Sequence, residues 1–159
     1  MKCLSKTHVA RLWIIFLLTG LSMFATSALS SAAVLKIGDS YGGGVVLYVD
    51  ATGQHGLIAA KADMIDRSSG KDMGYFTWYS AKNAVNAFEA GYCDWLLPNK
   101  EQLKQLYINR TLIGGLENTY YWSSSESGLS QAWAQDFSTG EQLDGNKTNT
   151  ARVRAVRFF

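Results

Sequence analysis

The sequence predicts an α+β domain in which an antiparallel sheet packs against two helices. Three observations lead to this prediction. Two β-branched segments joined by a short turn come first, and two amphipathic helical segments follow them. After these helices the helical period disappears, and short strand-like segments continue to the C-terminus. Strands grouped at both ends of a chain, with helices between them, are typical of an antiparallel α+β arrangement.

The first 33 residues have the pattern of a secretory signal peptide. Basic residues at the start precede an apolar run from Leu12 to Ala25, and small residues follow. Because this run is shorter than the ~20 residues of a spanning helix, we expect export and cleavage rather than an uncleaved membrane anchor. Residues 34–159 then form a single domain with no membrane span, located in the periplasm, at the cell surface or outside the cell.

The charge of the chain depends on this leader. The whole sequence has 15 Lys and Arg against 13 Asp and Glu, a formal charge of +2. The leader contains three of the basic residues (Lys2, Lys6 and Arg11) and no acidic one, so its removal leaves 12 against 13 and a charge of −1. A nucleic-acid-binding domain is expected to be basic, so we expect no nucleic-acid partner.

An early hairpin opens the predicted domain. The β-branched run Val45–Val49 ends in a turn at Thr52-Gly53, and Leu57–Ala60 continues as the second strand. His55 precedes this second strand. Since no nucleophile motif accompanies it, we expect a structural histidine rather than a catalytic base. The polar segment 61–74 is predicted to be a loop.

The first predicted helix follows an aromatic segment, Tyr75–Tyr79, whose side chains we expect in the core rather than in a sugar-binding platform. Ser80 is the predicted N-cap. Apolar residues then recur at helical spacing up to Phe88, and Gly91 is the predicted end.

The second predicted helix begins at Asn99, directly after Pro98, which is the only proline of the chain. Proline disfavours helical geometry in the residue before it, so the helix cannot extend further upstream. Asn99 is a good N-cap, and Gln102 completes the spacing of a capping box. Trp95 precedes the cap and is predicted to enter the core.

Short strands follow a predicted loop at residues 109–116. Tyr120–Ser124 and Ala132–Phe137 are two of them, and residues 152–159 form the last. Arg154 and Arg157 interrupt the apolar alternation of this last strand. A β-bulge would explain the interruption, and so would an arginine buried against a carboxylate.

Six segments, in the same order, match one bacterial domain family, and the most distinctive is Trp95-x-Leu97-Pro98-Asn99-x-x-Gln102-Leu103. The six segments are residues 43–50, 53–60, 94–107, 121–126, 132–140 and 153–157. The chain therefore resembles the domain that closes the Legionella collagen-like adhesins, the Lcl C-terminal domain. This resemblance implies a C-type-lectin-like fold, related to the formylglycine-generating-enzyme fold, in which the last strand returns beside the first hairpin. One departure is Leu96, where the family usually has arginine.

An enzymatic function has little support in the sequence. One histidine and one cysteine remain after the leader, and the G-x-S-x-G and H-E-x-x-H motifs are missing. We therefore expect a binding module that needs no cofactor. The resemblance implies a glycan or another surface ligand as its partner, and a structural or assembly protein of the envelope that binds protein is the alternative.

Two late polar loops, Ser123–Gln131 and Glu141–Thr150, carry the predicted ligand site. Sugar sites commonly combine an aromatic face with amides and carboxylates. The predicted ligand-binding residues are Trp122, Glu126, Gln131, Glu141, Asp144, Asn146 and Lys147. Alternatively, Trp122 and Trp133 belong to the core and the loops are only solvated. Calcium binding stays open, because these oxygen donors lack the spacing of a recognised calcium motif.

Overall fold

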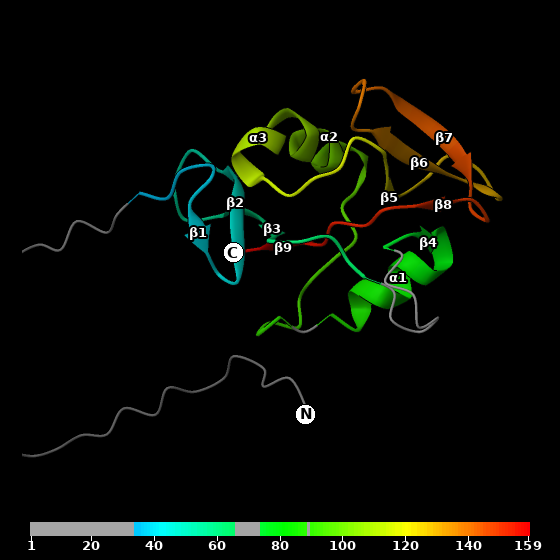
Figure 1. The fold of residues 1–159 in the computed structure, drawn as a ribbon. Coiled ribbons are helices and arrows are strands. Elements are labelled where there is room, and N and C mark those ends of the chain that lie inside the picture. The colour runs from blue at the N-terminus through cyan, green and yellow to red at the C-terminus, as the bar shows by residue number, and fades with distance from the viewer. Residues whose placement is uncertain (1–33, 66–73, 89) are drawn as a thin grey trace, which may run out of the picture. The chain divides into compact units, whose positions relative to one another are not determined.

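The computed structural model describes residues 34–65, 74–88 and 90–159. This part of the chain forms an α+β domain whose strands are all paired in antiparallel sheets, as predicted (Figure 1). The four-stranded sheet has the order β1-β2-β3-β9, with β1 Ser40–Tyr41, β2 Gly44–Val49, β3 Gly56–Ala60 and β9 Val156–Phe158. The three-stranded sheet consists of β5 Tyr120–Glu126, β6 Gln131–Asp136 and β7 Gln142–Asn146. The short pair consists of β4 Phe76–Thr77 and β8 Thr150–Ala151.

The described residues contain three helices, one more than predicted: α1 Trp78–Asn86, α2 Lys100–Ile108 and α3 Arg110–Ile113. The third is a single turn inside the segment predicted to be a loop. Its last residue, Ile113, is buried in the core cluster that contains Leu103 and Leu106 of α2, so tertiary packing stabilises a turn too short to be stable alone.

The early hairpin and the return of the last strand are confirmed. β2 and β3 pair antiparallel, with an irregularity between Val46 and Tyr48, and β9 pairs antiparallel with β3 so that Ile58 lies opposite Arg157. In Figure 1 the C-terminal segment runs from β8, beside the three-stranded sheet, to β9 in the four-stranded sheet. The end of the chain therefore joins the two larger sheets.

Helix α1 begins two residues before the predicted cap. Thr77 is the N-cap, and its Oγ1 accepts a hydrogen bond from the N–H of Ser80 at 3.3 Å. Trp78, the first helical residue, is buried and donates from Nε1 to the carbonyl oxygen of Ser123 at 2.8 Å. This tertiary anchor sets the start of the helix. The helix ends at Asn86 rather than at the predicted Gly91.

Helix α2 begins as predicted, with a complete capping box. The side-chain oxygen of Asn99 accepts from the N–H of Gln102 at 2.8 Å, and the side-chain oxygen of Gln102 accepts from the N–H of Asn99 at 2.9 Å. Ahead of the helix, Trp95 is 2% exposed and belongs to the core. The carbonyl oxygen of Pro98 accepts from the N–H of Ser124 at 2.7 Å, which attaches this segment to β5.

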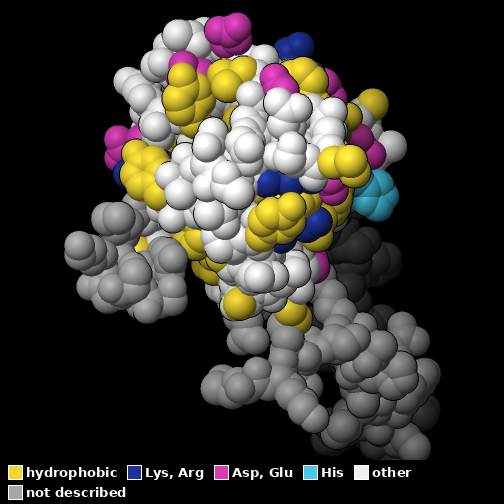
Figure 2. All heavy atoms as spheres, turned by 90° about the vertical axis from the view of Figure 1, so that its right-hand side faces the viewer, with side chains coloured by type: hydrophobic (Ala, Val, Ile, Leu, Met, Phe, Trp, Pro, Cys, Tyr) yellow, Lys and Arg dark blue, Asp and Glu magenta, His cyan; other side chains and the backbone are white. Residues whose placement is uncertain are grey.

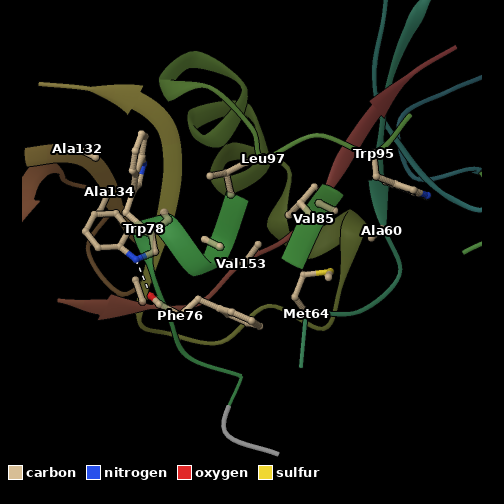
Figure 3. Close-up of a cluster of buried hydrophobic side chains, with 14 of the residues drawn as sticks. Ala60, Met64, Phe76, Trp78, Val85, Trp95, Leu97, Ala132, Ala134 and Val153 are labelled. Atoms are coloured by element: carbon tan, nitrogen blue, oxygen red, sulfur yellow. Dashed lines mark hydrogen bonds between the residues drawn. The ribbon is translucent and has the colours of Figure 1, made fainter. Parts of the chain in front are cut away.

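The core consists of two clusters, and the larger one is drawn in Figure 3. It extends from Ala132 and Ala134 of β6 to Trp95 and Ala60 at its other end. Phe76 and Trp78 are 3% exposed, which confirms the core prediction for these two aromatic residues. The flanking Tyr75 and Tyr79 are 40% and 56% exposed, so the aromatic segment as a whole is not buried.

Arg154 is fully buried and connects three segments that are far apart in the sequence. Its Nε donates to Oδ1 of Asp63 at 2.7 Å, and Nη1 donates to the carbonyl oxygen of Ala60 at 2.9 Å. The guanidinium also donates to the carbonyl oxygens of Gly114 and Gly115, after α3. The predicted last strand is shorter than expected, since residues 153–155 are not in a strand and β9 begins at Val156. Of the two explanations of its irregular pattern, the buried arginine is the one observed.

Arg157, in β9, is 4% exposed and forms an ion pair with Asp94, whose side chain is 59% exposed. Its Nε and Nη2 donate to the two carboxylate oxygens of Asp94 at 2.8 and 2.9 Å, and Nη1 donates to the carbonyl oxygen of Gly42 at 3.0 Å. The guanidinium also lies 3.8 Å from the ring centre of Tyr92. The planar fork of arginine suits this bidentate pairing.

The two late polar loops are shorter than predicted. β5 extends to Glu126 and β6 begins at Gln131, so only residues 127–130 connect them. Residues 142–146, predicted to be loop, form β7. Their polar character does not prevent a strand, because one face of β7 is solvated and its backbone pairs with β6 along its full length.

Candidate binding surface

The antiparallel register of β6 and β7 sets polar and aromatic side chains opposite one another on one face of the sheet. The pairs are Gln131 with Asn146, Trp133 with Asp144, and Gln135 with Gln142. Alternate residues of a strand share a face, and directly opposite residues have their Cβ atoms about 4.5–5.5 Å apart. We call these six residues the ladder.

Helix α2 covers one end of the ladder. Gln135 is fully buried, and Nε2 of Gln142 donates to the carbonyl oxygen of Lys100, the first residue of α2, at 2.9 Å. The ammonium of Lys100 lies 3.1 Å from the ring centre of Trp133. A cation so close to an indole face is attracted by the π electrons and orients the ring.

The other end of the ladder is open. Gln131, Asp144 and Asn146 are exposed, and Trp133 between them is half-buried. The side-chain oxygen of Asn146 accepts from the N–H and the hydroxyl of Thr148, at 3.0 and 2.9 Å, so the amide NH₂ is its remaining donor. The open end thus offers an indole edge, a carboxylate and amide groups.

Figure 2 shows the side of the molecule that carries the three-stranded sheet and α1. Hydrophobic side chains are exposed at several separate places among polar groups, and lysine or arginine side chains border one of them. This face is therefore mixed in character and has no continuous apolar surface.

Three of the seven predicted ligand-binding residues, Gln131, Asp144 and Asn146, come together on the open end of the ladder. Sequence reasoning did not select Trp133 and Lys100, which complete this surface. The face of Trp133 follows from the structure, in which the neighbouring Ala132 and Ala134 lie in the core and Trp133 points to the other side.

Trp122 lies in the core, as the alternative interpretation stated. It is 2% exposed, and its Nε1 donates to the carbonyl oxygen of Phe76 at 2.8 Å. Gly145 of β7 also lies against this ring, because a Cβ added at this position would lie 3.0 Å from it and would require the ring to shift. In this structure the Trp122 ring has no face open to a ligand.

Glu126 and Lys147 form an ion pair away from the ladder. The ammonium of Lys147 donates to Oε2 of Glu126 at 2.6 Å and to the carbonyl oxygens of Gly128 and Leu129 at 3.2 and 2.8 Å. Lys147 is only 3% exposed, so the expectation that it is an exposed loop residue is wrong. It follows the alternation of β7 onto the same side as Gly145. The hydrogen bond from Lys147 lowers the pKa of the Glu126 carboxyl group.

Glu141 is exposed in the turn before β7, outside the three pairs of the ladder. Its carbonyl oxygen accepts from the N–H of Asp136 at 2.9 Å, which closes the turn. Within the described ranges, no group of three or more His, Cys, Asp and Glu side chains is arranged to hold a metal ion. In the same ranges no helix has the length and apolar character needed to cross a membrane.

The fold and this surface define a small α+β domain with antiparallel sheets and one solvated, tryptophan-bearing sheet face. Residues 54–157 match the Lcl C-terminal domain, and because this match covers more than half of the chain, the protein belongs to that adhesin-associated family. No curated protein matches the chain.

Proposed function

We propose that this protein is a binding module of the cell envelope or the secreted fraction that recognises a glycan or another surface ligand. The open end of the ladder is the proposed site. The observation that carries the proposal is the half-buried Trp133 flanked by Gln131, Asp144 and Asn146 on a sheet face that α2 leaves uncovered. Membership of an adhesin-associated family supports the same function.

The chemistry of the open end suits a hydroxyl-rich ligand. The Asp144 carboxylate accepts hydrogen bonds, and the amide of Gln131 both donates and accepts. The indole provides apolar contact for the C–H groups of a sugar, and its position is held by Lys100. A strand pair also holds these groups more rigidly than a loop would, which reduces the ordering entropy lost on binding.

We propose binding rather than catalysis, because the ladder combines amides, one carboxylate and an indole, and none of its residues is a nucleophile paired with a base. A cofactor is not part of the proposal. Calcium dependence is measured by repeating the binding assay with a chelator and with added calcium.

The site is tested with the double variant Gln131→Ala/Asp144→Asn in a glycan array and a pull-down on cell-surface polysaccharide. We expect binding to weaken at least about tenfold, because the amide of Gln131 is lost and the side chain at position 144 loses its charge and one acceptor oxygen. The control is Gln54→Ala/Glu101→Gln, which changes exposed residues of the same chemistry outside the ladder. Unchanged binding by the double variant, with the thermal midpoint of the wild type, would remove the ladder as the site.

We also propose export, with residues 1–33 as the leader and a mature chain that begins between Leu29 and Val34. The charged, apolar and small-residue regions of the leader support this proposal. N-terminal sequencing and intact mass of protein from the envelope and culture medium provide the measurement. Recovery of the full-length chain in the cytoplasm alone would contradict it.

A further inference from the structure

A pocket of about 350 Å³ lies where α1, the segment before α2, β5 and β9 meet. None of its lining residues belongs to the ladder. The lining residues used below are Lys82, Leu96, Asn99, Gln102 and Phe158. The volume lies within the range of small-molecule sites, which is roughly 300–1,000 Å³.

One side of the pocket is apolar and open to solvent. Leu96 is 44% exposed and Phe158 is 57% exposed. Leu96 is held beside β9, because its N–H donates to the carbonyl oxygen of Val156 at 2.7 Å and its carbonyl oxygen accepts from the N–H of Val156 at 2.9 Å. Two large apolar side chains are thus fixed at the wall of one cavity, where covering them would release water from apolar surface.

The other side presents hydrogen-bond donors. In the capping box the side-chain oxygens of Asn99 and Gln102 accept backbone hydrogen bonds. The NH₂ groups of these two amides are therefore the donors that a ligand can use. Lys82 adds a positive charge, and its ammonium is kept near α1 by the ring of Trp78, 4.4 Å away.

Among the described residues that line the pocket there is no aspartate or glutamate to neutralise the charge of Lys82. The carboxylate of Glu126 accepts a hydrogen bond from Lys147 at 2.6 Å and interacts with Lys82 only through its charge. The polar side of the pocket therefore complements an anion rich in acceptor oxygens.

We infer that this pocket binds a small organic carboxylate that carries an apolar chain or ring. The carboxylate receives hydrogen bonds from Lys82 and from the amide NH₂ groups of Asn99 and Gln102, and the apolar group lies against Leu96 and Phe158. This inference does not depend on the function proposed for the ladder, since the two sites share no residue.

The probe is 3-phenylpropionate, titrated into the ¹⁵N-labelled full chain and followed by amide chemical shifts. We expect saturable shifts at Leu96, Gln102 and Phe158. Two comparison compounds separate the contributions: 3-phenylpropionamide lacks the charge, and acetate lacks the apolar group. Each is expected to bind at least about tenfold more weakly, because each loses one of the two interactions.

Two variants with matched controls locate the site. The control for Lys82→Ala is Lys104→Ala, which removes an exposed lysine of α2. The control for Phe158→Ser is Leu112→Ser on α3, because Leu112 is 59% exposed and Phe158 is 57% exposed. We expect the pocket variants to weaken binding about tenfold and the controls to leave it unchanged. Shifts that do not saturate, equal binding of acid and amide, or equal affinity in Lys82→Ala with an unchanged spectrum would overturn the inference. If Phe158→Ser disturbs the fold, the inference is still tested by Lys82→Ala with its control Lys104→Ala and by the two comparison compounds.

Discussion

At the scale of single residues, Lys147 shows how a charged side chain can be buried without an unsatisfied donor. An ammonium has three N–H donors, and Lys147 directs them to Glu126, Gly128 and Leu129. The ammonium also lies 4.7 Å from the ring centre of Trp78. The residues that connect β5 to β6 are thus held to the end of β7 by one side chain.

We predict that Lys147→Ala lowers the free energy of unfolding by about 1–3 kcal/mol, because three hydrogen bonds from a buried charged group are lost. The midpoint of urea unfolding provides the measurement. Lys104→Ala is the control, since Lys104 is exposed on α2 and should change the midpoint little. Equal midpoints for the two variants would mean that the Lys147 hydrogen bonds do not contribute to stability.

The two tryptophans of the three-stranded sheet show that residue type alone does not determine whether a side chain is buried. Trp122 and Trp133 have the same chemistry and lie on neighbouring strands, yet one is buried and the other half-exposed. The difference follows from the face to which each points. Trp122 lies opposite Ala134, whose side chain is in the core, whereas Trp133, the neighbouring residue of β6, points to the other face.

At the scale of elements, α2 is the helix whose start follows from local chemistry. Pro98 prevents an earlier start, and the capping box satisfies backbone groups of the first turn and of the cap. Helix α1 lacks such a signal of its own, because both Thr77 and Ser80 are good caps. The choice between them follows from the burial of Trp78, which is a tertiary contact.

We predict that Asn99→Ala costs about 1 kcal/mol of stability through loss of the N-cap. Asn118→Ala provides the matched control, because Asn118 is exposed in the bend before β5 and lies outside every helix. Chemical denaturation of both variants, with helix content followed by far-UV circular dichroism, gives the comparison. If Asn99→Ala lowers the free energy of unfolding no more than the control does, the observed capping box contributes little to stability.

At the scale of the whole molecule, the network around Asp63 joins the two ends of the domain. Asp63 follows β3, and its carboxylate accepts from Arg154 near the C-terminus and from the hydroxyl of Tyr121 on β5 at 2.7 Å. The hydroxyl of Tyr121 in turn accepts from the N–H of Glu117 at 2.8 Å. A buried carboxylate of this kind is tolerated because every partner is a donor.

This network predicts a loss of stability at alkaline pH. Burial, together with the hydrogen bond to Asp63, raises the pKa of Tyr121 above its ordinary value of 10.0. Above that pH the unfolded chain releases the phenolic proton while the folded chain retains it. The folded state then binds more protons, so the free energy of unfolding falls as the pH rises through and beyond 10.

The test compares the wild type with Tyr121→Phe between about pH 8 and pH 11. The variant should be less stable at pH 8, because two hydrogen bonds are lost, but should lose less stability on going to pH 11. Tyr79→Phe is the control, since Tyr79 is 56% exposed. Parallel pH profiles for all three proteins would contradict the role assigned to Tyr121.

The sequence by itself determined those features that depend on neighbouring residues: the early hairpin, the start of α2, the α+β class and, through its motifs, the family. Only the tertiary structure decided which polar residues act together. Gln131, Asp144 and Asn146 meet because β7 pairs with β6, and Lys147 separates from them because it comes directly after β7 and points to the other side of the sheet. Likewise Asp63 gave no local signal, since its partners Arg154 and Tyr121 are distant in the sequence. Strand register and buried charge pairs are fixed by contacts between distant segments, so a local pattern cannot reveal them.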